Sequence, residues 1–125
     1  MKLLNSFFKI LSESDNNNGE HVVTIELNPE HVIYKAHFPD MPVTPGVCII
    51  AMITEILEKM TGRQLKLQTV KNLKFVGIIS PLECHNVDIV YQNQDINGNQ
   101  IKTKGLLRDG DTVLTKFSMI YIIDE

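Results

Sequence analysis

The chain has 125 residues, of which 43% are hydrophobic and 22% are charged, and its net charge is −3. This length suits one domain with a single core, and the charge gives no basic patch for nucleic acid. Two cysteines, Cys48 and Cys84, are too few and too far apart for a disulfide framework or a metal knuckle.

The N-terminal segment is apolar but does not have the pattern of a signal peptide. Asn5, Ser6 and Lys9 interrupt it, and no small-residue cleavage site follows. We therefore expect a cytoplasmic protein. Next along the chain, residues 7–13 and 20–27 predict a β-hairpin with a polar tip at 15–19, because hydrophobic residues alternate along 21–27.

Residues 36–60 predict a stiff loop followed by a buried helix. Three prolines within residues 39–45 favour extended backbone. Thr44 is the predicted N-cap, with Pro45 at the first helical position and Gly62 at the C-terminal stop. The helix is apolar on almost every side, which indicates burial, and at about 15 residues it is too short to cross a membrane.

The second half of the chain predicts an antiparallel meander. Asn97-Gly98 and Asp109-Gly110 are strong hairpin signals, and Gly77 predicts a bulge or a close backbone approach. The expected strands are 65–80, 83–92, 101–108 and 112–123. Together with the first hairpin they indicate an α+β fold, in which an antiparallel sheet surrounds one long helix.

The loop and the helix start carry a recognisable motif. The segment from His37 to Val47, HFPDMPVTPGV, resembles the signature of the beta-hydroxyacyl-acyl-carrier-protein dehydratases, which have the hotdog fold. The segment FVGIISPLE at 75–83 is also similar to this family. The resemblance implies a single hotdog domain over 1–125 and a homodimer or larger oligomer. It implies an acyl carrier protein or other acyl-thioester substrate, with no metal or cofactor.

The chemistry of this family assigns roles to the motif. Dehydration removes a proton from C2 of a 3-hydroxyacyl thioester and hydroxide from C3, and a histidine suits the base near neutral pH. The resemblance makes His37 this catalytic base. Backbone N–H groups near Gly46 and Val47 would stabilise the thioester oxygen, and Phe38 would help to bind substrate. His21, His31 and His85 lie in ordinary strand or loop settings.

One position departs from the family pattern. The family places a Glu or Asp in the helix fourteen residues after the histidine, across the dimer interface, and this chain has Ala51 there. Glu55, one helical turn further on, and Asp40, close to His37, are candidate replacement acids. In the alternative, non-catalytic interpretation, Glu55 is a solvated carboxylate of the helix and Asp40 helps to shape the loop.

If the substrate is attached to an acyl carrier protein, this chain should have a surface charge that complements the carrier. Acyl carrier proteins are acidic, so their partners usually have a local basic surface. Residues 61–82 contain no acid, but they include Arg63, Lys66, Lys71 and Lys74. This excess is compatible with carrier docking, and equally with a strand edge that lysines protect from aggregation.

The sequence favours the first of three functions, and the other two stay open as alternatives. The first is dehydration, or the reverse hydration, of 3-hydroxyacyl thioesters, with a proton donor other than residue 51. The second is a subunit of a heteromeric dehydratase, whose partner supplies the acid. The third is a non-catalytic module that binds acyl chains or their carrier. Thioesterase activity is less favoured, because hotdog thioesterases do not usually share the His-Phe-Pro loop. Because it lacks the helix acid, this chain also resembles the dehydratase-like proteins of polyene-type pigment pathways.

Overall fold

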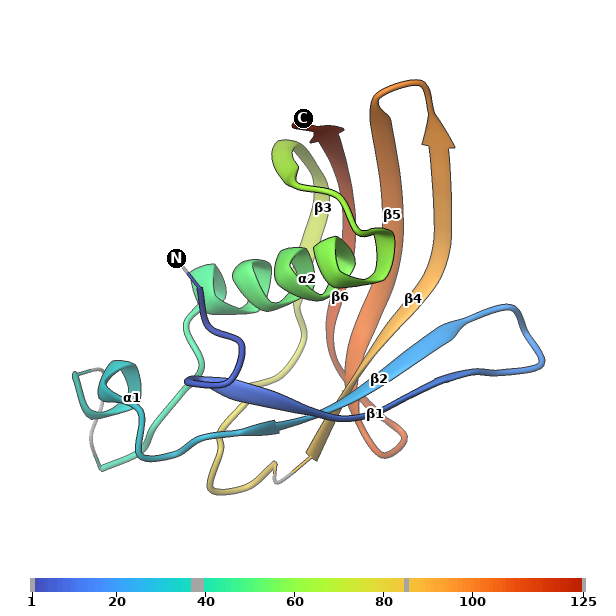
Figure 1. The fold of residues 1–125 in the computed structure, drawn as a ribbon. Helices are drawn as coiled ribbons and strands as arrows, with labels where there is room; N and C mark the ends of the chain where they lie inside the picture. The colour runs from blue at the N-terminus through green and yellow to red at the C-terminus, as the bar shows by residue number, and fades with distance from the viewer. Residues whose placement is uncertain (1, 37–39, 85, 125) are drawn as a thin grey trace.

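The computed structural model describes residues 2–36, 40–84 and 86–124. Six strands form one antiparallel sheet in the order β1-β2-β4-β5-β6-β3, and two helices lie between β2 and β3 in sequence (Figure 1). The elements are β1 Phe8–Asp15, β2 His21–Leu27, α1 Val32–Ala36, α2 Gly46–Thr61, β3 Leu65–Phe75, β4 Asn86–Asn97, β5 Gln100–Asp109 and β6 Thr112–Ile123.

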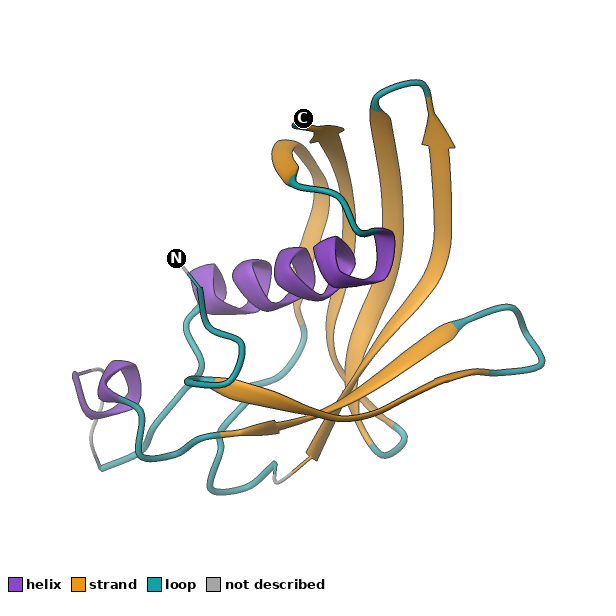
Figure 2. Ribbon diagram, in the orientation of Figure 1, coloured by secondary structure: helices purple, strands orange, loops and turns teal. Residues whose placement is uncertain are grey.

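The sheet curves around α2, whose buried face packs against it (Figure 2). The buried residues of α2 recur at helical spacing and are Cys48, Ile49, Met52, Ile53, Ile56 and Leu57. Tyr91, Phe117 and Tyr121 of the sheet are equally buried in this core. The arrangement confirms the expected α+β hotdog architecture. No helix within the described ranges is long and apolar enough to cross a membrane.

The two ends of α2 differ in how well the sequence predicted them. Gly62 is left-handed, with φ of 68°, and its N–H donates to the Glu58 carbonyl at 2.8 Å, as expected for a C-terminal stop. The predicted N-cap is wrong: Pro45 occupies that position and the helix begins at Gly46. The Thr44 hydroxyl does not cap the helix, because it is hydrogen-bonded to Tyr34.

The predicted hairpins are confirmed, whereas some strands begin or end at other residues than predicted. Gly98 and Gly110 have positive φ at the tips of the β4–β5 and β5–β6 hairpins. The strand expected over 65–80 ends at Phe75, because the next two N–H groups, of Val76 and Gly77, both donate to the Leu114 carbonyl and so leave the ladder. The short helix α1 was not foreseen.

Candidate active site at the start of the central helix

The sequence-predicted site residues fall into two groups. His37 and Phe38 lie outside the described residues. Gly46 and Val47 form the first turn of α2, and Asp40 is exposed in the loop that leads to it. The predicted roles of these residues stay predictions.

A buried hydrogen bond holds together the two flanks of the His37 loop. The Tyr34 hydroxyl of α1 lies 2.6 Å from the Thr44 hydroxyl, two residues before α2. The Phe7 ring stacks on Tyr34 with a centroid distance of 4.8 Å, and the Thr44 N–H donates to the Ile79 carbonyl at 2.8 Å. Burial raises the pKa of Tyr34, so its hydroxyl stays neutral. The sequence did not indicate this hydrogen bond between Tyr34 and Thr44. The segment Thr-Pro-Gly is typical of the start of a helix, and the Thr44 hydroxyl was therefore expected to cap the helix.

A small apolar pocket opens at the first turn of α2. Its volume is about 170 Å³, and it is lined by Val43, Thr44, Gly46, Ile49, Phe75, Gly77, Ile78 and Ile79. A Cβ atom on Gly46 would lie 2.9 Å from Cζ of Phe75, so glycine lets this ring cross the helix start closely. The first N–H groups of a helix have no partner within it, so the start of α2 at Gly46 offers a backbone donor at the edge of this apolar pocket.

Ala51 lies on the side of α2 that the sheet does not cover. It is half-buried, whereas Val47, one turn earlier, is 66% exposed. The buried residues of α2, such as Ile49 and Ile53, centre on the other side of the helix. A side chain at position 51 is therefore directed towards the open face of α2, and in this chain it ends in a methyl group.

Glu55 follows Ala51 along the same helix face, but its carboxylate already has partners. Its Oε1 accepts hydrogen bonds from the N–H groups of Leu3 and Leu4 at 2.9 and 2.8 Å, and its Oε2 accepts from Leu3 at 2.8 Å. Leu3 is buried, so these bonds fasten the N-terminal segment to α2. A role of Glu55 as replacement acid would require it to release both N–H groups.

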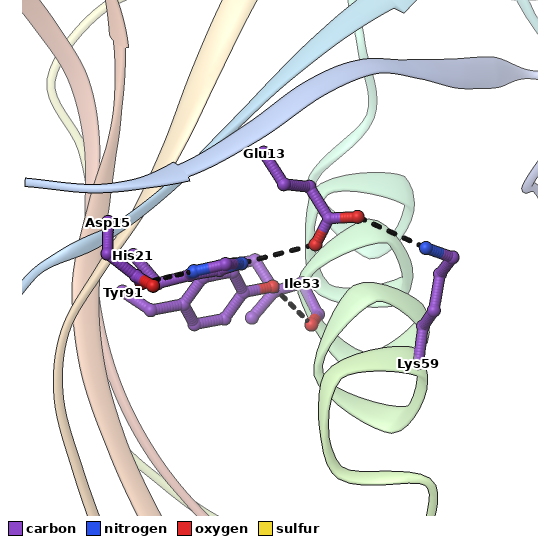
Figure 3. Close-up of polar contacts among 6 residues, drawn as sticks. All are labelled: Glu13, Asp15, His21, Ile53, Lys59 and Tyr91. Atoms are coloured by element: carbon purple, nitrogen blue, oxygen red, sulfur yellow. Dashed lines mark hydrogen bonds and ion pairs between the residues drawn. The ribbon is translucent and has the colours of Figure 1, made fainter.

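A second polar cluster lies at the other end of α2 (Figure 3). The His21 ring bonds the carboxylate of Asp15 through Nδ1 at 2.7 Å and that of Glu13 through Nε2 at 3.1 Å. Lys59 of α2 lies 3.1 Å from Glu13. With both ring nitrogens on carboxylates, this geometry favours the imidazolium form of His21 and leaves no ring nitrogen free for base catalysis. Among the described residues, no three potential ligands gather as a metal site.

This cluster predicts a pH window for stability. Burial lowers the pKa of His21, but hydrogen bonds to Asp15 and Glu13 outweigh it and leave the pKa above its ordinary 6.5. The hydrogen bond from His21, together with that from Lys59, lowers the pKa of Glu13 below 4.5. The contribution of His21 is thus complete below about pH 6.5 and is lost as pH rises through its raised pKa, whereas that of Glu13 is lost in acid.

The test is urea unfolding of the wild type and His21→Asn between pH 4 and pH 9. The wild type should exceed the variant most near pH 5–6, and the difference should shrink as pH rises above 7. His31→Asn is the control, because the ring of His31 accepts a hydrogen bond from the Ile33 N–H and meets the Phe7 ring edge-to-face, and neither partner is a carboxylate. A difference that is constant over this range would contradict the assignment.

Fold and site together define a hotdog-fold protein with a proline-braced loop at the start of its central helix. A family model described as ApeI-like, ApeI dehydratase, matches residues 12–105. The chain belongs to this ApeI-like dehydratase family. It is also 30% identical over 112 residues to the 3-hydroxyacyl-[acyl-carrier-protein] dehydratase FabZ of Lactiplantibacillus plantarum, covering 83% of this chain and 76% of the relative.

Solved structures of other proteins share the fold of this chain. A chain of the dehydratase heterocomplex ApeI:P from Xenorhabdus doucetiae superposes with a TM-score of 0.70 at 16% identity, over 90% of this chain and 96% of that chain. A conserved protein from Pseudomonas aeruginosa gives a TM-score of 0.63 at 10% identity, over 95% and 90% of the two chains. At these identities the likeness concerns the fold alone.

Proposed function

We propose that this protein acts on 3-hydroxyacyl thioesters as the histidine-bearing subunit of a heteromeric dehydratase. The observation that carries the proposal is the methyl group of Ala51 on the open face of α2, in a chain that belongs to a dehydratase family. Glu55, the nearest acid along that face, is bonded to the N-terminal backbone. A structural relative is itself a dehydratase heterocomplex, which supports the idea of a partner subunit.

The proposed reaction divides between the two subunits. His37 takes the C2 proton, and the N–H groups of Gly46 and Val47 stabilise the negative charge on the thioester oxygen. The C3 hydroxyl then leaves as water, with a proton from an acid of the partner subunit, and a 2-enoyl thioester remains. Phe38 and the apolar pocket beside Phe75 would hold the acyl chain. The acyl carrier protein as substrate carrier and a cytoplasmic location belong to the same proposal.

The proposal predicts that turnover appears on mixing. The protein alone should convert a 3-hydroxybutyryl N-acetylcysteamine thioester at least about 100-fold more slowly than an equimolar mixture with a homologous dehydratase subunit that carries the helix acid, because proton transfer by a positioned group contributes about 10²–10⁴-fold. Enoyl-thioester absorbance follows the reaction, and size-exclusion chromatography shows whether a mixed complex forms.

Variants at His37 test which subunit of the mixed complex supplies the catalytic histidine. To make the mixed site depend on this chain, the partner carries its own histidine-to-asparagine change. His37→Asn in this chain should then abolish turnover, whereas His31→Asn should retain it. Full activity of the protein alone, or turnover that survives His37→Asn, would overturn the proposal. Acyl-thioester binding without turnover in any mixture would favour a binding module.

A further inference from the structure

Two of the buried tyrosines belong to hydrogen-bond arrangements that are complete within the core. The Tyr91 hydroxyl donates to the Ile53 carbonyl at 2.7 Å. The Tyr121 hydroxyl lies 2.7 Å from the hydroxyl of Thr54, which in turn donates to the Ile50 carbonyl at 2.9 Å. Every hydroxyl hydrogen in these two arrangements therefore has an acceptor, as is usual for buried polar groups.

The third buried tyrosine forms a hydroxyl pair in which one hydrogen is not used. Tyr34 and Thr44 are 1% and 5% exposed, and their hydroxyl oxygens lie 2.6 Å apart. The hydrogen bond between them uses one of their two hydroxyl hydrogens. Within the part of the chain that the structure describes, neither hydroxyl has a second hydrogen-bond partner. The pair therefore retains one hydrogen that it can donate to another molecule.

The chemistry of the pair assigns this unused hydrogen to Thr44. A phenol is more acidic than an aliphatic alcohol, so the Tyr34 hydroxyl is the better donor and the Thr44 oxygen is the better acceptor. Thr44 also lines the pocket at Gly46, and Tyr34 does not. The hydroxyls of Thr103 and Thr115 are unpaired as well, but these residues do not line this pocket.

The side chain of Thr44 is held from two directions. Its N–H donates to the Ile79 carbonyl at 2.8 Å, and its hydroxyl contacts Tyr34, whose ring stacks on Phe7. Threonine is branched at Cβ, so rotation of its side chain is restricted. The hydroxyl hydrogen itself still rotates about the C–O bond to suit an acceptor. The oxygen is thus fixed in place, while its hydrogen is free to turn towards a ligand.

A backbone donor belongs to the same pocket. The Cys48 N–H donates to the Pro45 carbonyl at 3.0 Å, so the Gly46 N–H comes before the first hydrogen bond of the helix. Gly46 and Thr44 both line the pocket. The start of α2 therefore combines a main-chain donor and a side-chain donor in one apolar setting, where an acceptor oxygen would be bound strongly because water does not compete.

We propose, resting on the proposed function, that the Thr44 hydroxyl donates a hydrogen bond to the thioester oxygen of the substrate and that Tyr34 orients this hydroxyl. Thr44 is then a catalytic residue, and Tyr34 is a positioning residue that acts through it. The thioester oxygen gains negative charge as His37 takes the C2 proton, so this hydrogen bond strengthens during the reaction.

The pair donates a hydrogen bond and does not transfer a proton. Burial raises the pKa of Tyr34, which makes its proton harder to release. The proton that leaves with the C3 hydroxyl therefore still comes from another acid, as the heteromeric proposal requires.

Infrared difference spectroscopy reads this hydrogen bond without turnover. The probe is the crotonyl N-acetylcysteamine thioester, isotope-labelled at its carbonyl carbon and bound to the protein. A hydrogen bond to the carbonyl oxygen lowers its stretching frequency, so the labelled band should lie lower in the wild type and in Thr44→Ser than in Thr44→Val. The same band position in the wild type and Thr44→Val would overturn the proposal. Failure of the wild type to bind the probe, alone and in the mixed complex, would overturn it too.

The double variant Tyr34→Phe/Thr44→Val separates the donor from the packing. It removes both hydroxyls, so its stability in urea should be close to that of the wild type, whereas Thr44→Val alone leaves the Tyr34 hydroxyl unpaired and should be less stable. In the mixed complex, both variants should lose at least about tenfold in kcat on the 3-hydroxybutyryl N-acetylcysteamine thioester, with KM changed by less than about threefold. If the double variant recovers activity together with stability, the pair only supports the loop and the proposal is wrong.

Tyr121→Phe/Thr54→Val is the matched control, because it removes a buried hydroxyl pair of the same core whose hydrogens already have acceptors. It should leave the infrared band in place and change kcat by less than about threefold. If no mixture turns over a thioester but the band depends on Thr44, the hydrogen-bond proposal stands and the proposed function fails. If the mixture is active and Thr44→Val keeps the wild-type kcat, the proposed function stands and the hydrogen-bond proposal fails.

Discussion

Replacement of Gly105 by alanine is expected to lower the free energy of unfolding by about 3 kcal/mol, at the upper end of the range for overpacking. A Cβ atom at this position would collide with the carbonyl oxygen of Val90 on the neighbouring strand and would lie 2.7 Å from Cζ of Phe117. The Val90 oxygen belongs to the backbone, so it cannot move aside without disturbing the β4–β5 ladder.

The glycine matters for the site because of what packs over it. Gly105 is opposite both Tyr91 and Phe117, whose rings meet edge-to-face at a centroid distance of 5.8 Å. The Tyr91 hydroxyl donates to the Ile53 carbonyl of α2 at 2.7 Å. Displacement of these rings would therefore also loosen the anchor between the sheet and α2.

Urea unfolding of Gly105→Ala and Gly19→Ala measures the effect. At Gly19, which has φ of 76° and open space around it, alanine meets only the backbone cost of the left-handed region, about 1–2 kcal/mol. Equal losses in the two variants would show that packing around Gly105 is looser than the structure indicates.

Local patterns were sufficient to predict most of the fold. Asn97-Gly98 and Asp109-Gly110 specify their own turns, and the apolar run over residues 47–57 predicted the central helix, although Val47 within it is 66% exposed. The errors arose where a distant residue decides the outcome. Thr44 bonds Tyr34 and leaves the helix uncapped, and the strand after Phe75 ends because Leu114 accepts two N–H groups.

The candidate site was less predictable for the same reason. Ala51 and Glu55 share a helix face, as their spacing indicated, but nothing in the local sequence shows that Glu55 accepts bonds from Leu3 and Leu4. Of the basic residues that the sequence places after α2, Lys66, Lys71 and Lys74 lie on β3. The edge position of β3 is compatible with both earlier interpretations, carrier docking and protection of the strand edge.

Replacement of Ala51 by glutamate is expected to give the protein, without a partner subunit, a gain in dehydratase turnover of about 10²–10⁴-fold. Ala51 is half-buried at the margin of the core, one turn from the exposed Val47, so a longer side chain at this position would extend towards solvent. In a homo-oligomer each such acid could face the His37 loop of a neighbouring copy, and each site would then be complete.

Ala51→Gln is the matched control, because glutamine has nearly the same shape but no acidic proton. Turnover of the N-acetylcysteamine thioester should rise in Ala51→Glu and not in Ala51→Gln, and adding Glu55→Gln to Ala51→Glu should leave the gain intact. Equal rates in Ala51→Glu and Ala51→Gln would place the proton donor elsewhere. If instead Glu55→Gln in the wild-type background removes a measurable basal turnover, Glu55 supplies the proton after releasing Leu3 and Leu4. The pair of substitutions thus decides whether the missing acid is the reason that this helix needs a partner.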